Sequence, residues 1–351
     1  MSKIKLKFII ALLFYSTFVF SQNKEKFVFI DSNIVEADSS ITLYLSFKVP
    51  NKNLVFKKNS EDSYKAGISI NYEISSNKNI IDRASIQRSI SVQSYDETIR
   101  HDSFLQGLSE IKLQLGNYEI KPFISIDNSQ ISFIDEPIII EQNKYLNIGN
   151  PIICSLTNEV CSGSQLKLVN LSNMVNYGDY NSIILLPADN KYDSLHISLR
   201  QEGKIILEKS VGEKVLTPVK FTECEKGIFI EGDSTIKKNQ TYFILKDFGN
   251  KIMEGKVKII ATSNKDTVHN YFQEVYWLNK PKSLSESETA FKFLEMIESK
   301  DKLKELLKKN NDDYLLALNQ YWVDKNPHKN DTFNRLKEEY YSRIDYAIQN
   351  Y

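Results

Sequence analysis

Three cysteines are the residues whose chemistry is easiest to define from this sequence: Cys154, Cys161 and Cys224. Cys154 and Cys161 are seven positions apart and flank a turn-like segment at 157–159, so they could close a small disulfide loop and leave Cys224 over. Three free thiols are the alternative. A metal site would need a fourth ligand at a defined spacing, and none of the four histidines lies in a ligand motif. We therefore predict a Cys154–Cys161 disulfide and no metal site.

Two adjacent carboxylates, Glu338 and Glu339, could suggest general acid–base chemistry. Successive helical residues point about 100° apart, so the two groups would not converge on one substrate atom, and a solvated helix face is the simpler interpretation. The sequence contains no nucleophile elbow, phosphate-binding loop, dinucleotide fingerprint or zinc-binding helix, and residues 162–164 and 177–179 are small-residue turns. We predict no catalytic residue and no cofactor, and therefore a protein that is not an enzyme.

The N-terminus has the layout of a secretion signal. Three lysines within the first seven residues precede 13 mostly apolar residues, 8–20, and a charged stretch follows. A membrane anchor is the alternative, but a span needs roughly 20 apolar residues. We predict that residues 1–21 are removed as a signal peptide. The protein would then be exported to the periplasm, the outer-membrane surface or the medium, and would have no transmembrane span.

The charge balance argues against nucleic acid as a partner. Lysine plus arginine and aspartate plus glutamate are equal, at 45 each, and no long block of one sign occurs. Nineteen tyrosines and nineteen phenylalanines supply ample core material for a sheet-rich protein. Removal of the signal leaves about 330 residues, enough for two or three domains at roughly 100–200 residues each. An envelope protein or a glycan is the expected partner.

Period-two alternation of apolar residues dominates residues 23–147 and predicts several short strands. The clearest pair is 111–115 with 118–126, joined by Gly116 and Asn117. We interpret this pair as a hairpin in which Gly116 adopts a positive φ. Many short strands at such spacing favour a β-sandwich of immunoglobulin-like architecture.

Residues 148–280 repeat this pattern. Six strand candidates lie between residues 182 and 260, and residues 201–203 read as a short hairpin turn. These features favour a second β-sandwich. The best boundary between the two sandwiches is residues 145–151.

Helical periodicity begins at about Pro281. Ser285 with Glu288 matches a capping box. Apolar residues then recur at helical spacing in four segments, the third at 313–325 before Pro327 and the last from Asp331 onward. The expected fold class is mainly β with a C-terminal α module: immunoglobulin-like sandwich domains at 23–147 and 148–280, followed by a small helical domain at 281–351.

Two aromatic pairs in this helical part, Tyr321–Trp322 and Tyr340–Tyr341, could form a ligand platform. Their register with neighbouring apolar residues instead favours packing in a helical core. Arg343 could act as a polar clamp between helices by approaching Asp324, and a loop histidine, His328, is expected to be exposed.

The C-terminal part also resembles a known family. The resemblance begins at Tyr276–Trp277 and continues through the helix at 290–297. In the last part of the chain it rests on Tyr321, Trp322, Pro327, Asn334, Tyr340, Tyr341 and Arg343. This pattern is similar to the start of the GWxTD domain, found in exported proteins of Bacteroidetes and related bacteria. The family has no established biochemical activity, so the resemblance implies an envelope location and gives these positions a structural role.

Two departures from the family pattern matter. Asn326 stands where the family has aspartate, and the following loop reads Pro327-His328-Lys329. The chain stops at Tyr351, just before the Gly-Trp-x-Thr-Asp signature is due. The sequence is therefore expected to be a truncated or fragmentary member of the family.

The leading functional hypothesis is a non-catalytic binding or assembly protein of the cell envelope. One alternative is an envelope hydrolase whose active site lies in a missing C-terminal part. Another is a carbohydrate-binding module, in which exposed aromatic rings stack on sugars. That last alternative requires Trp277 or Trp322 to be exposed to solvent.

Overall fold

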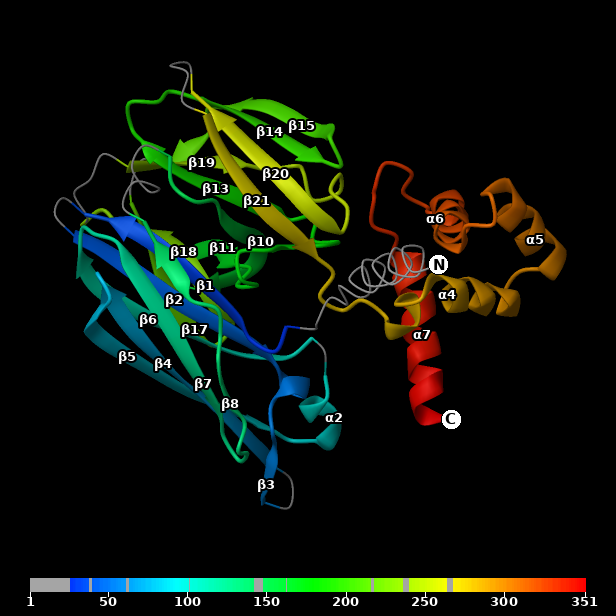
Figure 1. Cartoon of the computed structure of the whole chain (residues 1–351), viewed down its shortest axis with the longest axis horizontal. Helices are drawn as coiled ribbons and strands as arrows, with labels where there is room; N and C mark the ends of the chain where they lie inside the picture. Colours follow the sequence, from blue (N-terminus) through cyan, green and yellow to red (C-terminus); the bar gives the residue numbers. More distant parts are fainter. Residues whose placement is uncertain are drawn as a thin grey trace, which may run out of the picture.

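The computed structural model describes most of the chain as a body of stacked sheets with a group of helices at one side (Figure 1). The predicted signal peptide, residues 1–21, lies outside the described residues, as do residues 145–147 of the predicted boundary. The described residues are 26–37, 40–60, 63–100, 102–141, 148–161, 163–215, 218–235, 240–263 and 268–351.

Two antiparallel sheets form what we call the first sheet pair, residues 29–140. The three-stranded sheet has the order β1-β2-β6, with β1 at Phe29–Glu36, β2 at Ser40–Pro50 and β6 at Phe104–Gln114. The six-stranded sheet contains β3 (Lys57–Ser60), β4 (Ser63–Ser76), β5 (Asn79–Val92), β7 (Tyr118–Ile126), β8 (Ser132–Ile134) and β9 (Ile138–Ile140). A short helix, α2 (Tyr95–Thr98), follows β5.

Alternating side chains hold these two sheets together. On β4, Ile68, Ile70, Tyr72 and Ile74 point to one face and are at most 1% exposed. They pack against the three-stranded sheet in a shared core. Full burial of one such side chain stabilises the fold by roughly 1.5–3 kcal/mol. The period-two pattern of the sequence therefore identified this core-facing row correctly.

The predicted hairpin at Gly116 is wrong. β6 pairs with β2 and β7 pairs with β4, so the two strands belong to different sheets. The chain crosses between the sheets at Gly116 and Asn117, and Gly116 is not among the glycines with positive φ. Leu113 and Tyr118, on either side of the crossing, both contribute to the core between the sheets. Alternation reports which face is buried, and it does not report which strand is the partner.

Two further sheets form the second sheet pair, residues 152–276. The seven-stranded sheet contains β10 (Ile152–Cys161), β11 (Ser164–Leu168), β13 (Ser182–Asp189), β16 (Lys214–Val215), β17 (Val219–Cys224), β18 (Gly227–Gly232) and β19 (Gln240–Leu245). The five-stranded sheet contains β12 (Val175–Asn176), β14 (Leu195–Gln201), β15 (Lys204–Val211), β20 (Gly255–Thr262) and β21 (Val268–Tyr276). All six predicted strands coincide with strands of this pair.

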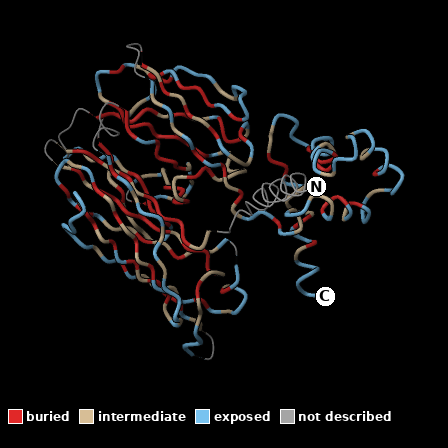
Figure 2. The backbone as a smooth tube through the Cα atoms, viewed as in Figure 1, coloured by how far each residue is buried: buried red, intermediate tan, exposed pale blue. Residues whose placement is uncertain are grey.

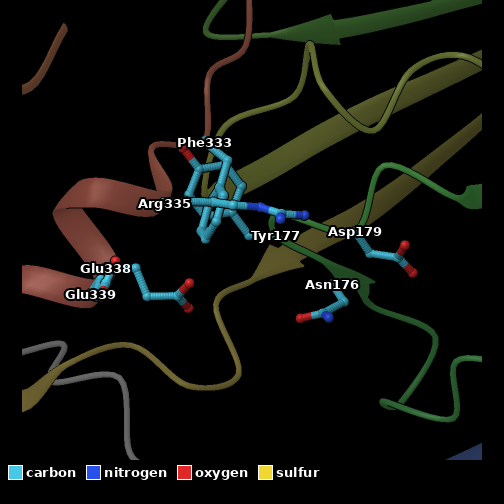
Figure 3. Close-up of a pocket in the computed structure, with 8 residues that line it drawn as sticks. Asn176, Tyr177, Asp179, Phe333, Arg335, Glu338 and Glu339 are labelled. Carbon is cyan, nitrogen blue, oxygen red and sulfur yellow. The ribbon is translucent and has the colours of Figure 1, made fainter. Parts of the chain in front are cut away.

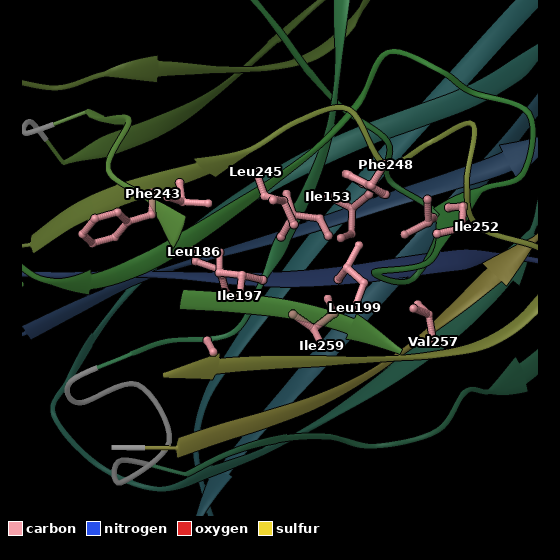
Figure 4. Packing of buried hydrophobic residues seen from close by; sticks show 14 of the residues in the cluster. Ile153, Leu186, Ile197, Leu199, Phe243, Leu245, Phe248, Ile252, Val257 and Ile259 are labelled. Atoms are coloured by element: carbon pink, nitrogen blue, oxygen red, sulfur yellow. The ribbon is translucent and has the colours of Figure 1, made fainter. Parts of the chain in front are cut away.

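The core of the second sheet pair is almost entirely aliphatic and aromatic (Figure 4). Leu186 and Phe243 come from the seven-stranded sheet, whereas Ile197 and Ile259 come from the five-stranded sheet. The predicted turn at 201–203 is confirmed, because β14 and β15 pair directly with Gln201 opposite Lys204. Glu202 and Gly203 both have positive φ, at 49° and 77°, as a tight hairpin turn requires.

A third core joins the two sheet pairs. β2 is buried on both faces, so Tyr44 points away from the first core and packs against the second sheet pair. Its ring lies 4.8 Å from that of Phe221 on β17, centroid to centroid. Val35 of β1 enters the same core beside Ile183 of β13. The four sheets therefore stack as one continuous β body, residues 29–276, in which buried segments run through every layer (Figure 2).

A carboxylate reinforces this contact between the sheet pairs. Glu223 of β17 accepts hydrogen bonds from Nε and Nη2 of Arg88, at 2.9 and 2.7 Å. It also accepts one from the backbone N–H of Leu108 on β6, at 3.0 Å. A bidentate guanidinium contact fixes direction as well as distance. Glu223 thus ties β5 and β6 of the first sheet pair to the second.

The predicted Cys154–Cys161 disulfide is wrong. Both cysteines lie on β10, and an extended strand separates residues seven positions apart by roughly 20 Å. Residues 157–159, interpreted as a turn, are part of that strand. Cys161 instead bonds Cys224 at the end of β17, with the Cα atoms 6.6 Å apart. Cys154 is a free thiol in the core between the sheet pairs, where burial raises its pKa above the ordinary value.

The remaining chain forms the helical module, residues 282–350. Its helices are α4 (Ser287–Phe293), α5 (Lys300–Lys309), α6 (Tyr314–Lys325) and α7 (Arg335–Asn350), with 3-10 turns at Lys282–Leu284 and Leu294–Met296. The four segments that were predicted to be helical after Pro281 are helical in the structure. Among the described residues, none of the helices combines the length and apolarity needed to cross a membrane.

The ends of the helices differ in part from prediction. The capping box at Ser285 and Glu288 is wrong, because Glu286 precedes α4 and makes no side-chain capping bond. Asp313 caps α6, accepting hydrogen bonds from two backbone N–H groups of the first turn. The last helix begins at Arg335 rather than near residue 331, since Asn334 supplies its N-cap.

Candidate functional site

The loop between α6 and α7, residues 326–334, attaches the helical module to the second sheet pair. Thr332 is its main anchor: its backbone N–H donates to the carbonyl of Asn250 at 3.0 Å, and its own carbonyl accepts from the Tyr177 hydroxyl at 2.8 Å. The Asn250 side chain also donates to the Asp331 carboxylate at 3.2 Å. These bonds fix the module relative to the β body.

An aromatic cluster lies at the same junction. Tyr177, Trp277 and Phe333 contact one another edge to face, with ring centroids 5.0 to 5.5 Å apart. Each ring comes from a different segment: the turn after β12, the strand exit after β21 and the loop before α7. Gly178 has a φ of +89°, and a Cβ there would lie 3.0 Å from the Phe333 ring. Glycine is therefore required both by its backbone and by this close approach.

A polar cleft of about 580 Å³ opens beside this cluster (Figure 3). It lies between the turn after β12 and the first two turns of α7. In Figure 3 the Arg335 side chain extends from α7 toward the loop that carries Asp179. The lining consists of Asn176, Tyr177, Gly178, Asp179, Phe333, Arg335, Glu338 and Glu339. Three carboxylates and one guanidinium give the lining a formal charge of −2.

The charged groups of the cleft have different surroundings. The Arg335 guanidinium lies 5.9 Å from the centroid of the Tyr180 ring, close enough for a cation–π contact. Glu338 accepts a hydrogen bond from Nε1 of Trp277 at 3.4 Å, and partial burial raises the pKa of its carboxyl above the ordinary value. Glu339 is exposed and pairs with Arg343 one turn along α7. The two adjacent carboxylates thus diverge, although only Glu339 lies on a solvated face.

The family-pattern aromatic residues build the inside of the helical module. Tyr321, Trp322 and Tyr341 are at most 6% exposed, which confirms the predicted core packing. The Tyr341 hydroxyl donates to the carbonyl of Ala290 at 2.7 Å, and that of Tyr340 donates to the carbonyl of Phe293 at 2.6 Å. These bonds tie α7 to α4.

The family-pattern asparagine and its neighbours organise the α6–α7 loop. Asn334 Nδ2 donates to the carbonyl of Trp322 at 2.6 Å, and its Oδ1 accepts from the backbone N–H of Lys337. Asn326, buried, donates to the carbonyl of Asp331 at 3.0 Å. Pro327 follows two residues after the end of α6, as its lack of a backbone N–H leads one to expect.

The predicted interhelical clamp of Arg343 is wrong. Its side chain is 78% exposed and bonds Glu339 on its own helix. Asp324, the expected partner, accepts instead from Gln320 at 2.7 Å. His328 is exposed in the loop, as predicted. Within the described part of the chain, no three His, Cys, Asp or Glu side chains come together as metal ligands would.

The cleft residues were largely missed by sequence reasoning. Tyr177–Asp179 gave only the signal of a small-residue turn, and Phe333 looked like part of a helix. Tyr177 and Thr332 are 155 positions apart in the chain, and no local pattern reports such a contact. The one usable signal in the sequence was Gly178 beside Tyr177, because glycine readily adopts a positive φ, as Gly178 does.

Neither models of known protein families nor curated proteins match this sequence.

Proposed function

We propose that this chain is an exported, non-catalytic binding protein of the cell envelope that receives a basic segment of a partner protein in the junction cleft. The observation that carries the proposal is the composition of the cleft, in which Asp179, Glu338 and Glu339 outnumber a single guanidinium beside an aromatic wall. A lysine or arginine side chain would gain both ionic and ring contacts there.

The rigidity of the junction supports this role. The aromatic cluster and the hydrogen bonds of Thr332 hold both walls of the cleft in place. A preformed site loses less conformational entropy on binding than a flexible one, so it can bind more tightly for the same contacts.

The finer assignments are parts of the same proposal. The β body comprises two immunoglobulin-like sandwiches, at residues 23–147 and 148–280, and the helical module begins a GWxTD-like domain. Support for the second assignment comes from the roles of Trp322, Asn334 and Tyr341, which organise the module from within. Such roles explain why a family would share these residue types without sharing a reaction.

A glycan is the weaker partner. Trp277 and Trp322 are 7% and 5% exposed, so neither can stack on a sugar. Phe272 on the outer face of β21 is 70% exposed, but the ammonium of Lys258 lies 5.6 Å from its ring centroid. That contact competes with a sugar for the ring.

Site-specific photo-crosslinking tests the proposal. A photoreactive phenylalanine analogue replaces Asn176 at the rim of the cleft, and in a control it replaces Ile80, which is 48% exposed on the first sheet pair. We expect one envelope protein to crosslink at position 176 only, through a peptide that contains lysine or arginine.

Charge removal is the second arm. Combined Glu338→Gln and Glu339→Gln substitutions should abolish the crosslink at position 176, whereas Glu305→Gln on the exposed face of α5 should leave it intact. A crosslink to an acidic or uncharged segment, or one that survives the double substitution, would show that the cleft does not bind as proposed.

A further inference from the structure

A second polar assembly lies between the two sheet pairs, on the loop that immediately precedes β12 and the cleft residues Asn176–Asp179. The loop that joins β11 to β12, residues 169–174, lies against β1 and β2 of the first sheet pair. Asn170 Nδ2 donates to the carbonyl of Phe47 at 2.9 Å, and its Oδ1 accepts from the Ser46 hydroxyl at 2.8 Å. Lys48 Nζ donates to the carbonyl of Val169 at 3.2 Å. The loop therefore joins the two sheet pairs by hydrogen bonds, in addition to the apolar core that they share.

The loop has an unfavourable backbone conformation. Asn170, Ser172 and Asn173 all have positive φ, between 54° and 57°. Non-glycine residues rarely adopt this region, and a loop with three of them persists only if its surroundings hold it. The restraints come from the first sheet pair: Ile30 donates its backbone N–H to the Ser172 hydroxyl at 2.9 Å, and Asp31 accepts the backbone N–H of Asn173.

Asp31 is the centre of these restraints. Asp31 is 3% exposed, and its Oδ1 accepts the hydrogen bond from the backbone N–H of Asn173. The second carboxylate oxygen is buried and has no hydrogen-bond partner among the described residues. A buried carboxylate with an unsatisfied oxygen carries a desolvation cost that a proton would remove.

The titratable groups around Asp31 come from both sheet pairs. Lys26 and Lys48 approach it from the first sheet pair and its N-terminal lead, and the Cys154 thiol approaches from β10. Burial raises the pKa of Asp31 to about 7, against the opposing effects of the backbone N–H groups of Asn173 and Ser172 and of the two lysines. Burial likewise lowers the pKa of Lys48 to about 8. Lys167 and Asp179 also act on Lys48, from the second sheet pair.

We propose that Asp31 and the 169–174 loop form a proton-operated latch between the two sheet pairs, which closes when Asp31 takes up a proton and loosens when it ionises. When the loop is released, Asp31 meets water and recovers an ordinary carboxyl pKa. The docked loop therefore binds the proton more tightly than the released loop does. Docking strengthens as the pH falls through about 7 and is at full strength below the ordinary pKa of about 4.

Hydrogen exchange in the full chain measures this equilibrium directly. The observable is the protection of amides 28–36 and 169–174, corrected for the intrinsic pH dependence of exchange. We expect protection in both segments to fall by about 50-fold between pH 5 and pH 7, because each pH unit below the docked pKa of about 7 changes the equilibrium by up to a factor of ten. Amides in β13 should not follow this profile.

Three variants separate a latch from an ordinary structural contact. Asp31→Asn keeps an oxygen for the Asn173 amide but cannot ionise, so protection should become independent of pH. Lys48→Met removes a cation that lowers the Asp31 pKa, so the transition should move to higher pH. Asp301→Asn, on the exposed face of α5, should leave the wild-type profile unchanged.

The wild-type chain alone can overturn the proposal. Carbon-13 NMR titration of the Asp31 carboxyl should give a midpoint well above 4, together with loop protection that follows it. A midpoint near the ordinary aspartate value, or loop protection that does not change with pH, would refute the latch. So would an Asp31→Asn chain that folds and retains the wild-type pH profile.

Discussion

At the scale of single residues, the Tyr341 hydroxyl links two helices from inside a core. Tyr341 is fully buried, and its bond to the carbonyl of Ala290 measures 2.7 Å. Tyr341→Phe should lower the free energy of unfolding by about 1 kcal/mol, because the ring stays and only one buried hydrogen bond is lost. Urea denaturation followed by helical circular dichroism measures this change. Tyr346→Phe is the control, since Tyr346 is 67% exposed and should show no loss.

Two features of Gly178 disfavour any larger residue: its positive φ and its close approach to the Phe333 ring. Gly178→Ala would place a Cβ at a positive φ and against the Phe333 ring, whereas Gly203→Ala meets the same kind of φ with open space around it. We expect Gly203→Ala to lower the free energy of unfolding by about 1 kcal/mol. Gly178→Ala should lower the free energy of unfolding by more than this. It should also speed proteolysis of residues 277–286, because the contact between the helical module and the β body loosens. Equal effects of the two substitutions on both measurements would show that the Phe333 contact is unimportant.

At the scale of elements, the disulfide closes a long segment of the second sheet pair. Cys161 and Cys224 are 63 positions apart, and a cross-link over such a loop stabilises by about 4 kcal/mol in the chain-entropy account. The double substitution Cys161→Ser with Cys224→Ser should therefore lower the melting temperature, and a reducing agent should lower the melting temperature of the wild type but not that of the double variant. Cys154→Ala is the control, because its thiol is free and its loss should not abolish the effect of reduction.

Element type was predictable because it is a local property. β4 has isoleucine or tyrosine at every second position from 68 to 74, and that spacing alone identifies a half-buried strand. The partner of a strand is not local. Leu113 and Tyr118 alternate as hairpin residues would, yet they face one core from two different sheets. The same limit explains the cysteines: two that are near in sequence lie on one extended strand, and the bonded pair spans two strands.

At the scale of the whole molecule, the candidate site arises only when the modules meet. The interior of the helical module could be read from the register of Tyr321, Trp322 and Tyr341, since helical periodicity reports a local core. The cleft could not, because Tyr177 and Arg335 approach only after the β body has formed and the α6–α7 loop has docked on it. Sequence reasoning therefore found the residues that organise the helical module, and it noted Glu338, Glu339 and the turn at 177–179 without placing them in one cleft.

The core shared by the two sheet pairs should make the β body unfold as one unit. Tyr44 belongs to β2 in the first sheet pair but is 4% exposed in the core shared with the second. In native-state hydrogen exchange with increasing urea, the slowest amides of β4 and β13 should converge on one free energy of opening, as members of one cooperative unit do. Different limiting values in the wild type would mean that the two sheet pairs are independent despite this core.

Tyr44→Ala tests whether that core causes the coupling. Removal of a large buried ring costs about 3 kcal/mol or more when the cavity cannot collapse. If Tyr44 only stabilised the first sheet pair, β4 amides would lose protection and β13 amides would not. Because the ring packs on Phe221 of β17, we expect both sheet pairs to lose stability and their opening free energies to separate. Tyr95 is 63% exposed, so Tyr95→Ala should leave the opening free energies of the β4 and β13 amides unchanged and equal to each other.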